Sequence, residues 1–121
     1  MIKVGEHITL DIIGTTKEYD PSVYERVINQ IAKAADVTIL NISKYKFEPQ
    51  GFTILALLAE SHISFHTFPE KGIISFDFFT CGKISPSIAI NIMVKRSSVS
   101  IKFFFNNSFM FEFFFNNINS Y

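Results

Sequence analysis

The segment FTILALLA, residues 52–59, constrains the fold of this chain more than any other. Its side chains are almost all apolar, so a strand built from it is predicted to be central in a sheet or covered, because both faces avoid water. The chain then continues in an extended form over residues 62–66, turns over residues 67–72 and returns as a strand over residues 73–82. We therefore expect a sheet at the centre of the domain.

Two segments carry the signals of amphipathic helices. Residues 20–36 are predicted to form a helix, with Asp20 as its N-cap and Pro21 at its first position. The apolar side chains of this helix share one face: Val23, Val27, Ile31 and Ala34. Residues 85–96 begin with a similar signal, Ser-Pro, and are predicted to form a second helix.

The order of the elements predicts the fold class. Further strands are expected over residues 7–14, 37–43 and 98–105. The resulting order, β-α-β-β-β-α-β, favours an α+β two-layer sandwich, in which a mostly antiparallel sheet has two helices packed on one face. With no linker or repeat, residues 1–121 are expected to form a single domain. The Phe- and Asn-rich tail, residues 103–121, is expected to add a strand, cover an edge or pack across an oligomer interface.

Composition excludes several function classes. The chain has 11 basic and 11 acidic residues and a formal net charge of zero, which disfavours nucleic-acid binding through a broad basic face. No apolar run is long enough for a membrane span, and the N-terminal MIKVGEHITL lacks the apolar core of a signal peptide. Cys81 is the only cysteine, which fits a reducing cytoplasm and leaves a thiol free for chemistry.

Reactive side chains gather in AESHISFHTFPE, residues 59–70, directly after the apolar strand. If the strands over residues 52–59 and 73–82 flank this segment, Ser61, His66 and Cys81 are expected in one neighbourhood. A hydroxyl, an imidazole and a thiol together indicate nucleophilic or acid–base work. A hydrolase would also need a carboxylate to orient the base, for which Asp77 and Glu70 are candidates.

The two histidines of this segment are not expected to bind a metal together. On a strand, His62 and His66 share a face but lie about 13 Å apart, which is too far for a single ion.

The motifs resemble those of a known family. ESHISFHTFPE followed by DFFTCG is similar to the prokaryotic type of S-adenosylmethionine decarboxylase proenzyme, which has Glu-Ser-His, His-Thr-Trp-Pro-Glu and Phe-Thr-Cys-Gly at this spacing. The upstream Phe47-x-Pro49-x-Gly51-x-Thr53 is similar to the family's Phe-x-Pro-x-Gly-x-Ser. The resemblance covers about residues 5–100 and is most specific over residues 47–82.

The resemblance implies self-cleavage at the Glu60–Ser61 bond, into a β chain of residues 1–60 and an α chain of residues 61–121. The Ser61 hydroxyl would attack the carbonyl carbon of Glu60 to give an ester, whose elimination leaves a dehydroalanine that hydrolyses to an N-terminal pyruvoyl group. Its ketone would form a Schiff base with the substrate amine and act as the electron sink for decarboxylation.

The resemblance also implies a role for each matching residue. His66 would be the base of the processing step, Thr53 would hydrogen-bond the attacked carbonyl, and Cys81 would return a proton to the substrate. Phe47 and Phe68 would stack on the adenine of S-adenosylmethionine, and Glu70 would bind its ribose. The product would be the aminopropyl donor for spermidine synthesis, and the enzyme would be a homodimer of cleaved protomers.

Two departures from the family pattern keep alternatives open. Phe68 stands where the family has Trp, and Ile54 stands where a glycine is usual. A pyruvoyl-dependent decarboxylase of ornithine or arginine is therefore an alternative. A separate alternative is an uncleaved regulatory or binding homologue, whose site has been spoiled by AT-biased drift of the sequence. A hydrolase that uses Ser61 and His66 is a more distant one.

Overall fold

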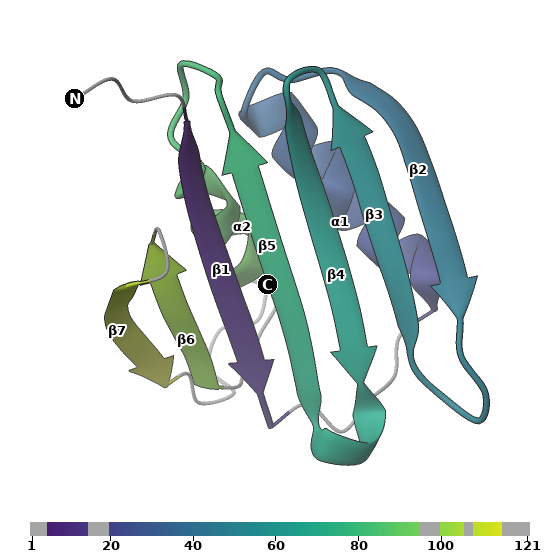
Figure 1. Cartoon of the computed structure of the whole chain (residues 1–121). Coiled ribbons are helices and arrows are strands. Elements are labelled where there is room, and N and C mark those ends of the chain that lie inside the picture. The colour runs from purple at the N-terminus through teal and green to yellow at the C-terminus, as the bar shows by residue number, and fades with distance from the viewer. Residues whose placement is uncertain (1–4, 15–19, 95–99, 106–107, 115–121) are drawn as a thin grey trace.

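A computed structural model describes residues 5–14, 20–94, 100–105 and 108–114 of the chain (Figure 1). Within these ranges, seven strands form a single sheet in the order β2-β3-β4-β5-β1-β6-β7, and every neighbouring pair is antiparallel. The strands are β1 (Glu6–Ile13), β2 (Ile39–Lys46), β3 (Phe52–Leu58), β4 (Ser61–Phe68), β5 (Ile73–Thr80), β6 (Ser100–Phe105) and β7 (Ser108–Phe114).

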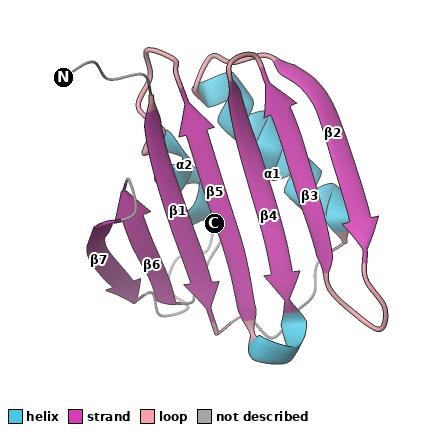
Figure 2. Ribbon diagram, viewed as in Figure 1, coloured by secondary structure: helices cyan, strands magenta, loops and turns pink. Residues whose placement is uncertain are grey.

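Two α-helices, α1 (Pro21–Ala34) and α2 (Ile88–Val94), lie on the same side of this sheet (Figure 2). A short 3₁₀ helix, η1 (Pro69–Lys71), joins β4 to β5. The predicted two-layer α+β sandwich with an antiparallel sheet is confirmed. We call the face of the sheet that turns away from α1 and α2 the open face.

The core lies between the sheet and the helices. Alternate residues of the central strands point into it, among them Phe65, Phe76 and Phe78, whose exposed fractions are 2% or less. Tyr24 of α1 packs edge-on against Phe65, with ring centroids 5.2 Å apart. Burying such large side chains on one face of each strand holds the register of the sheet, because a slip of one residue would turn them all into water.

The polar start of α1 follows the sequence prediction. Asp20 is the N-cap, its carboxylate accepts a hydrogen bond from the backbone N–H of Ser22 at 2.9 Å, and Pro21 takes the first position. That hydrogen bond holds the pKa of the Asp20 carboxyl below its ordinary value.

The second helix is shorter than predicted. The Ser85 hydroxyl accepts the backbone N–H of Ser87 at 3.3 Å, as a cap would, but residues 85–87 form turns and α2 begins only at Ile88. The predicted end of the helix, residues 95–96, lies outside the described residues.

The sequence pattern predicts that residues 62–66 continue the preceding strand, but in the structure they belong to a separate strand, β4. The chain reverses at Ala59–Glu60, and β4 runs antiparallel to both β3 and β5. Glu60 makes this turn possible by adopting the left-handed conformation, with φ of 61°, and the backbone N–H of Ala59 donates to the carbonyl of Thr38 at 2.9 Å. The predicted flanking of residues 60–70 by residues 52–59 and 73–82 is nevertheless confirmed.

Strand β3 is interior in the sheet, as predicted, but in the described residues the helices cover only one of its faces. Ile54, Ala56 and Leu58 point into the core, whereas Leu55 and Leu57 lie on the open face with exposed fractions of 48% and 55%. The tail adds the edge strand β7 to the sheet, and residues 115–121 lie outside the described residues.

Candidate active site

Ser61 and Cys81 meet where β4 begins and β5 ends. Ser61 is directly opposite Thr80 in the sheet, and the chain leaves β5 immediately afterwards, at Cys81. Ser61 is 7% exposed; its hydroxyl donates to Thr80 Oγ1 at 3.3 Å and accepts the backbone N–H of Cys81 at 3.4 Å. The predicted proximity of Ser61 and Cys81 is confirmed, and the Cys81 thiol is a free, half-buried group.

The peptide bond between Glu60 and Ser61 joins the turn to the strand. Glu60 is exposed and left-handed, a conformation that costs a residue with a Cβ about 1–2 kcal/mol. Ser61, the next residue, is buried and held by hydrogen bonds from its hydroxyl. The bond therefore lies at the rim of the sheet, and the serine hydroxyl is held by Thr80 and Cys81 at the end of β5.

His66 lies near the other end of β4, on the open face. It is paired across the sheet with Thr53, and the Thr53 hydroxyl and His66 Nδ1 are 2.9 Å apart. This contact fixes the orientation of the imidazole. Ile54, the departure from the family's glycine, is fully buried among core residues, so its side chain points to the helix layer and not to Thr53's face of the sheet.

The predicted substrate-binding residues lie at the same end of the sheet as His66. The β2–β3 loop, which carries Phe47, is closed by a hydrogen bond from the Phe47 N–H to the Gly51 carbonyl at 2.8 Å. Gly51 has φ of 89°, and a Cβ there would be 3.0 Å from the Thr67 carbonyl oxygen, so glycine lets this loop approach the end of β4. Phe47 and Phe68 are 47% and 37% exposed, which leaves their rings available for stacking.

Glu70, in η1, belongs to the same group. Its carboxylate accepts a hydrogen bond from Gln50 Nε2 at 3.5 Å, which links η1 to the β2–β3 loop. Figure 1 shows this loop and η1 at one end of the sheet and the β3–β4 turn at the other.

The candidate residues thus form two groups. We call Glu60, Ser61, Thr80 and Cys81 the processing end, and Phe47, Thr53, His66, Phe68 and Glu70 the aromatic end. Ser61 and His66 are five residues apart on one strand, which corresponds to about 16 Å and to opposite faces of the sheet. The prediction that His66 lies beside Ser61 and Cys81 is therefore wrong within one chain.

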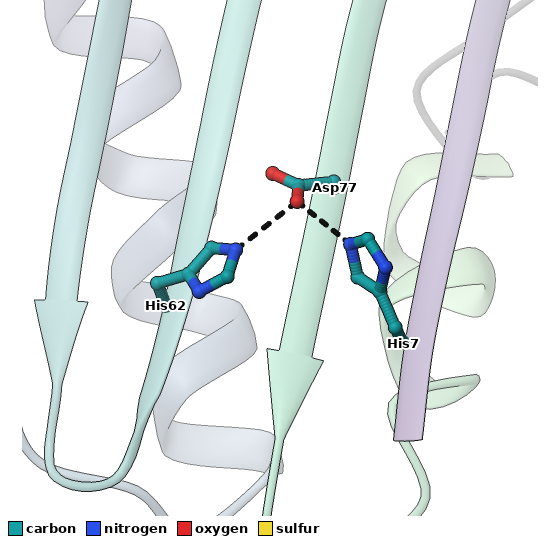
Figure 3. A group of neighbouring side chains, drawn as sticks. All are labelled: His7, His62 and Asp77. Carbon is teal, nitrogen blue, oxygen red and sulfur yellow. Dashed lines mark hydrogen bonds and ion pairs between the residues drawn. The ribbon is translucent and has the colours of Figure 1, made fainter. Parts of the chain in front are cut away.

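The hydrolase alternative needs a carboxylate that orients His66, and Asp77 does not do this. Its Oδ2 atom lies 2.8 Å from His7 Nε2 and 3.1 Å from His62 Nε2 (Figure 3). Its Oδ1 accepts a hydrogen bond from the Ser64 hydroxyl. Burial raises the pKa of the Asp77 carboxyl, but the hydrogen bonds from Ser64, His7 and His62 outweigh it and hold the pKa below its ordinary value. Sequence reasoning missed this group, because only the strand register brings His7 to Asp77.

Comparison with known proteins decides the family. A model of the family described as S-adenosylmethionine decarboxylase matches residues 6–102. The chain belongs to this family. The match includes both the processing end and the aromatic end. Within the described residues, no helix is long and apolar enough to cross a membrane.

Relatives of the S-adenosylmethionine decarboxylase family resemble the chain over most of its described length. A protein of Synechococcus named S-adenosylmethionine decarboxylase proenzyme is 48% identical over 81 residues, 65% of this chain and 63% of that protein, so the aligned part is just under two thirds of its length. One of Methanococcus vannielii with the same name is 43% identical over 86 residues, 69% of this chain and 70% of that protein.

The fold is also that of a decarboxylase of known structure. The crystal structure of the adenosylmethionine decarboxylase from Aquifex aeolicus superposes with a TM-score of 0.70 at 28% identity, covering 89% of this chain and 92% of that chain.

Proposed function

We propose that this chain is a proenzyme that cleaves itself between Glu60 and Ser61 and then decarboxylates S-adenosylmethionine. The observation that carries the proposal is the environment of Ser61. Ser61 is a buried residue at the start of a strand, directly after a strained turn, and its hydroxyl accepts the backbone N–H of Cys81, the only cysteine of the chain. This is the arrangement that an internal nucleophile with a neighbouring proton donor requires. The names of the relatives, which call them proenzymes, support it.

Self-cleavage uses groups of the chain and one water molecule. The Ser61 Oγ attacks the carbonyl carbon of Glu60, the C–N bond breaks, and an ester and a free amine form. Removal of the Ser61 Cα proton then expels the Glu60 carboxylate and leaves dehydroalanine, which takes up water and releases ammonia to become a pyruvoyl group. The left-handed conformation of Glu60 favours the first step, because cleavage releases the strain of the turn.

Ser61 fits the role of pyruvoyl precursor, because it has a β-hydroxyl, follows the turn directly and would become an accessible N-terminus after cleavage. The pyruvoyl ketone supplies an electron sink for the charge left when carbon dioxide departs, which no ordinary side chain provides. Cys81 would then donate the proton to the substrate α-carbon, since its backbone N–H already contacts the Ser61 hydroxyl.

The aromatic end suits the nucleoside part of S-adenosylmethionine. Phe47 and Phe68 are exposed rings in neighbouring segments and would stack on the adenine, and either ring face also attracts the sulfonium cation. The Lys71 ammonium already lies 5.8 Å from the centre of the Phe68 ring, which indicates that this ring attracts a cation. Glu70 would accept hydrogen bonds from the ribose hydroxyls.

The separation of the two ends supports a composite site in a homodimer. A symmetric pair of chains, in which the processing end of one protomer meets the aromatic end of its partner, would assemble two complete sites. His66, held by Thr53, would then act as the base at Ser61 of the partner chain. The apolar residues that the described chain leaves exposed on the open face favour such a contact: Tyr45, Leu55, Leu57 and Phe68.

We place the reaction in the cytoplasm, because Cys81 must remain a thiol to act as a proton donor, and a reducing compartment preserves it. The decarboxylated product would carry the aminopropyl group for spermidine synthesis.

The proposed activity is tested by measuring carbon dioxide release from S-adenosylmethionine, ornithine and arginine, each labelled at the carboxyl carbon. Release from S-adenosylmethionine is expected, and it should be lost in the Ser61→Ala variant and strongly reduced in Cys81→Ser. Release from ornithine or arginine instead would support the alternative substrates. At the aromatic end, the one feature that favours them is Phe68, which stands where the family has Trp. No release from any of the three by cleaved protein would contradict the proposal.

A further inference from the structure

Three side chains from neighbouring strands meet on the open face, close to the processing end, since one of them, His62, directly follows Ser61. They are His7 of β1, His62 of β4 and Asp77 of β5, the strand between them (Figure 3). Each offers one ligand atom, and these atoms all lie within 4.8 Å of one another. The resemblance and the proposed reaction leave all three without a chemical role.

We propose that His7, His62 and Asp77 form a binding site for a first-row divalent transition metal ion such as Zn²⁺ or Co²⁺. Two imidazole nitrogens and one carboxylate oxygen are a donor set that such ions favour, in a facial arrangement that leaves further positions open. Hard ions such as Mg²⁺ prefer oxygen donors and do not match it.

Two of the three distances between ligand atoms suit an ion of this size, and the third, between the two imidazole nitrogens, is within 4.8 Å. With metal–ligand bonds of about 2.1 Å, neighbouring ligand atoms are about 3.0 Å apart at right angles and about 3.4 Å apart in a tetrahedron. Asp77 Oδ2 lies 2.8 Å from His7 Nε2 and 3.1 Å from His62 Nε2. A small rotation of the two imidazoles, which now point at one oxygen, would admit an ion between the three atoms.

The surroundings hold the three side chains in place. The Ser64 hydroxyl hydrogen-bonds Asp77 Oδ1, which leaves Oδ2 turned towards the imidazoles. In known metal sites, hydrogen bonds of this kind from neighbouring groups orient the ligands. Phe79 is paired across the sheet with both His7 and His62, and its ring centroid lies 6.1 Å and 5.9 Å from theirs. This ring fills the space on one side of the imidazoles, so both reach towards Asp77.

In the single chain, the site is open to an ion from solution. The side chain of His62 is 49% exposed, and those of His7 and Asp77 are 29% and 23% exposed. Binding would replace the two hydrogen bonds to Asp77 with metal–nitrogen bonds, leaving the proton of each neutral imidazole on Nδ1, and would tie β1, β5 and β4 together on the open face.

Metal titration tests the proposal, and the composition of the chain makes it clean. The chain has three histidines and one cysteine, so a His66→Ala, Cys81→Ser variant removes every imidazole and thiol outside the proposed site. This variant, made without a histidine tag and stripped with a chelator, is titrated with Co²⁺, followed by visible absorbance, and Zn²⁺ is measured by competition.

We expect one Co²⁺ per chain, a dissociation constant below about 100 μM, and the same affinity in the parent protein. His62→Ala in this background should weaken binding at least tenfold, about the loss that even an outer contact of a metal site causes. Because His62 is half exposed, this variant is expected to fold, which circular dichroism checks. Asp77→Asn, which removes the proposed carboxylate ligand, is the second variant and is titrated in the same way. Absence of saturable binding, or equal binding in His62→Ala, would overturn the proposal.

Discussion

A mixture of two inactive variants should restore self-cleavage, if the site is shared between two protomers. Ser61→Ala lacks the nucleophile and His66→Ala lacks the proposed base. Within one chain these residues are about 16 Å apart on opposite faces of β4, whereas proton transfer needs a separation of about 3 Å. His66 of a chain therefore cannot serve Ser61 of the same chain, but it can serve a partner.

The size of the effect follows from random pairing. When the two variants are co-expressed in equal amounts, about half of the His66→Ala chains pair with a Ser61→Ala chain. Each such dimer contains one complete site, formed by Ser61 of the first chain and His66 of the second. About half of the His66→Ala chains should therefore be cleaved, and no Ser61→Ala chain should be cleaved.

Mass spectrometry distinguishes the products, because each variant has its own mass. The controls are the two variants expressed alone, which should stay intact, and size-exclusion chromatography, which should show that mixed dimers form. Uncleaved His66→Ala chains in a sample that contains mixed dimers would refute the shared site. Cleavage of His66→Ala expressed alone, at the parent rate, would instead remove His66 from the role of base.

Three further outcomes are expected. Phe65→Ala, at a fully buried core position, should lower the free energy of unfolding by about 3–5 kcal/mol in urea denaturation, because it leaves a cavity in the core. A loss below about 1 kcal/mol would mean that neighbouring side chains fill this cavity. Thr53→Val should slow self-cleavage in a gel time course whereas Thr53→Ser should not, because the hydroxyl holds the imidazole; equal rates would contradict this role. The folded pKa of Asp20 is depressed, so its charge stabilises the protein above its unfolded pKa, and this stabilisation is lost as the pH falls through the folded pKa. The difference in Tm between the parent and Asp20→Asn should therefore shrink as the pH is lowered below about 4, and a constant difference would show that the capping charge contributes nothing.

The layers of the fold were predictable from local signals. The cap at Asp20 and the apolar face of α1 identify the first helix, and alternation identifies the strands and the face they bury. The turn at Ala59–Glu60 was not predictable, because it has no glycine, proline or asparagine. Its left-handed residue is a glutamate, so the sequence pattern predicts that residues 62–66 continue in extended form and gives no sign of a separate strand β4.

In the candidate site too, contacts between strands that follow each other along the chain were predictable, whereas contacts between distant segments were not. The proximity of Ser61 and Cys81 follows from strands that neighbour each other along the chain. An odd separation along a strand places His66 on the other face from Ser61, and that rule of alternation was available from the sequence once β4 was taken as one strand. The contact between His7 and Asp77 was not available, since it joins residues 70 positions apart through a register that only the folded sheet defines.

The central claim is that Ser61 becomes the reactive group of the enzyme, and the intact mass of the purified protein tests it most directly. The account predicts two fragments that meet at the Glu60–Ser61 bond, the second with a blocked N-terminus and a mass that shows ammonia lost and a ketone gained. The Ser61→Ala variant, measured beside it, should give one full-length mass. A single full-length mass for the parent chain after prolonged incubation would contradict the account, because the group on which decarboxylation depends would never form.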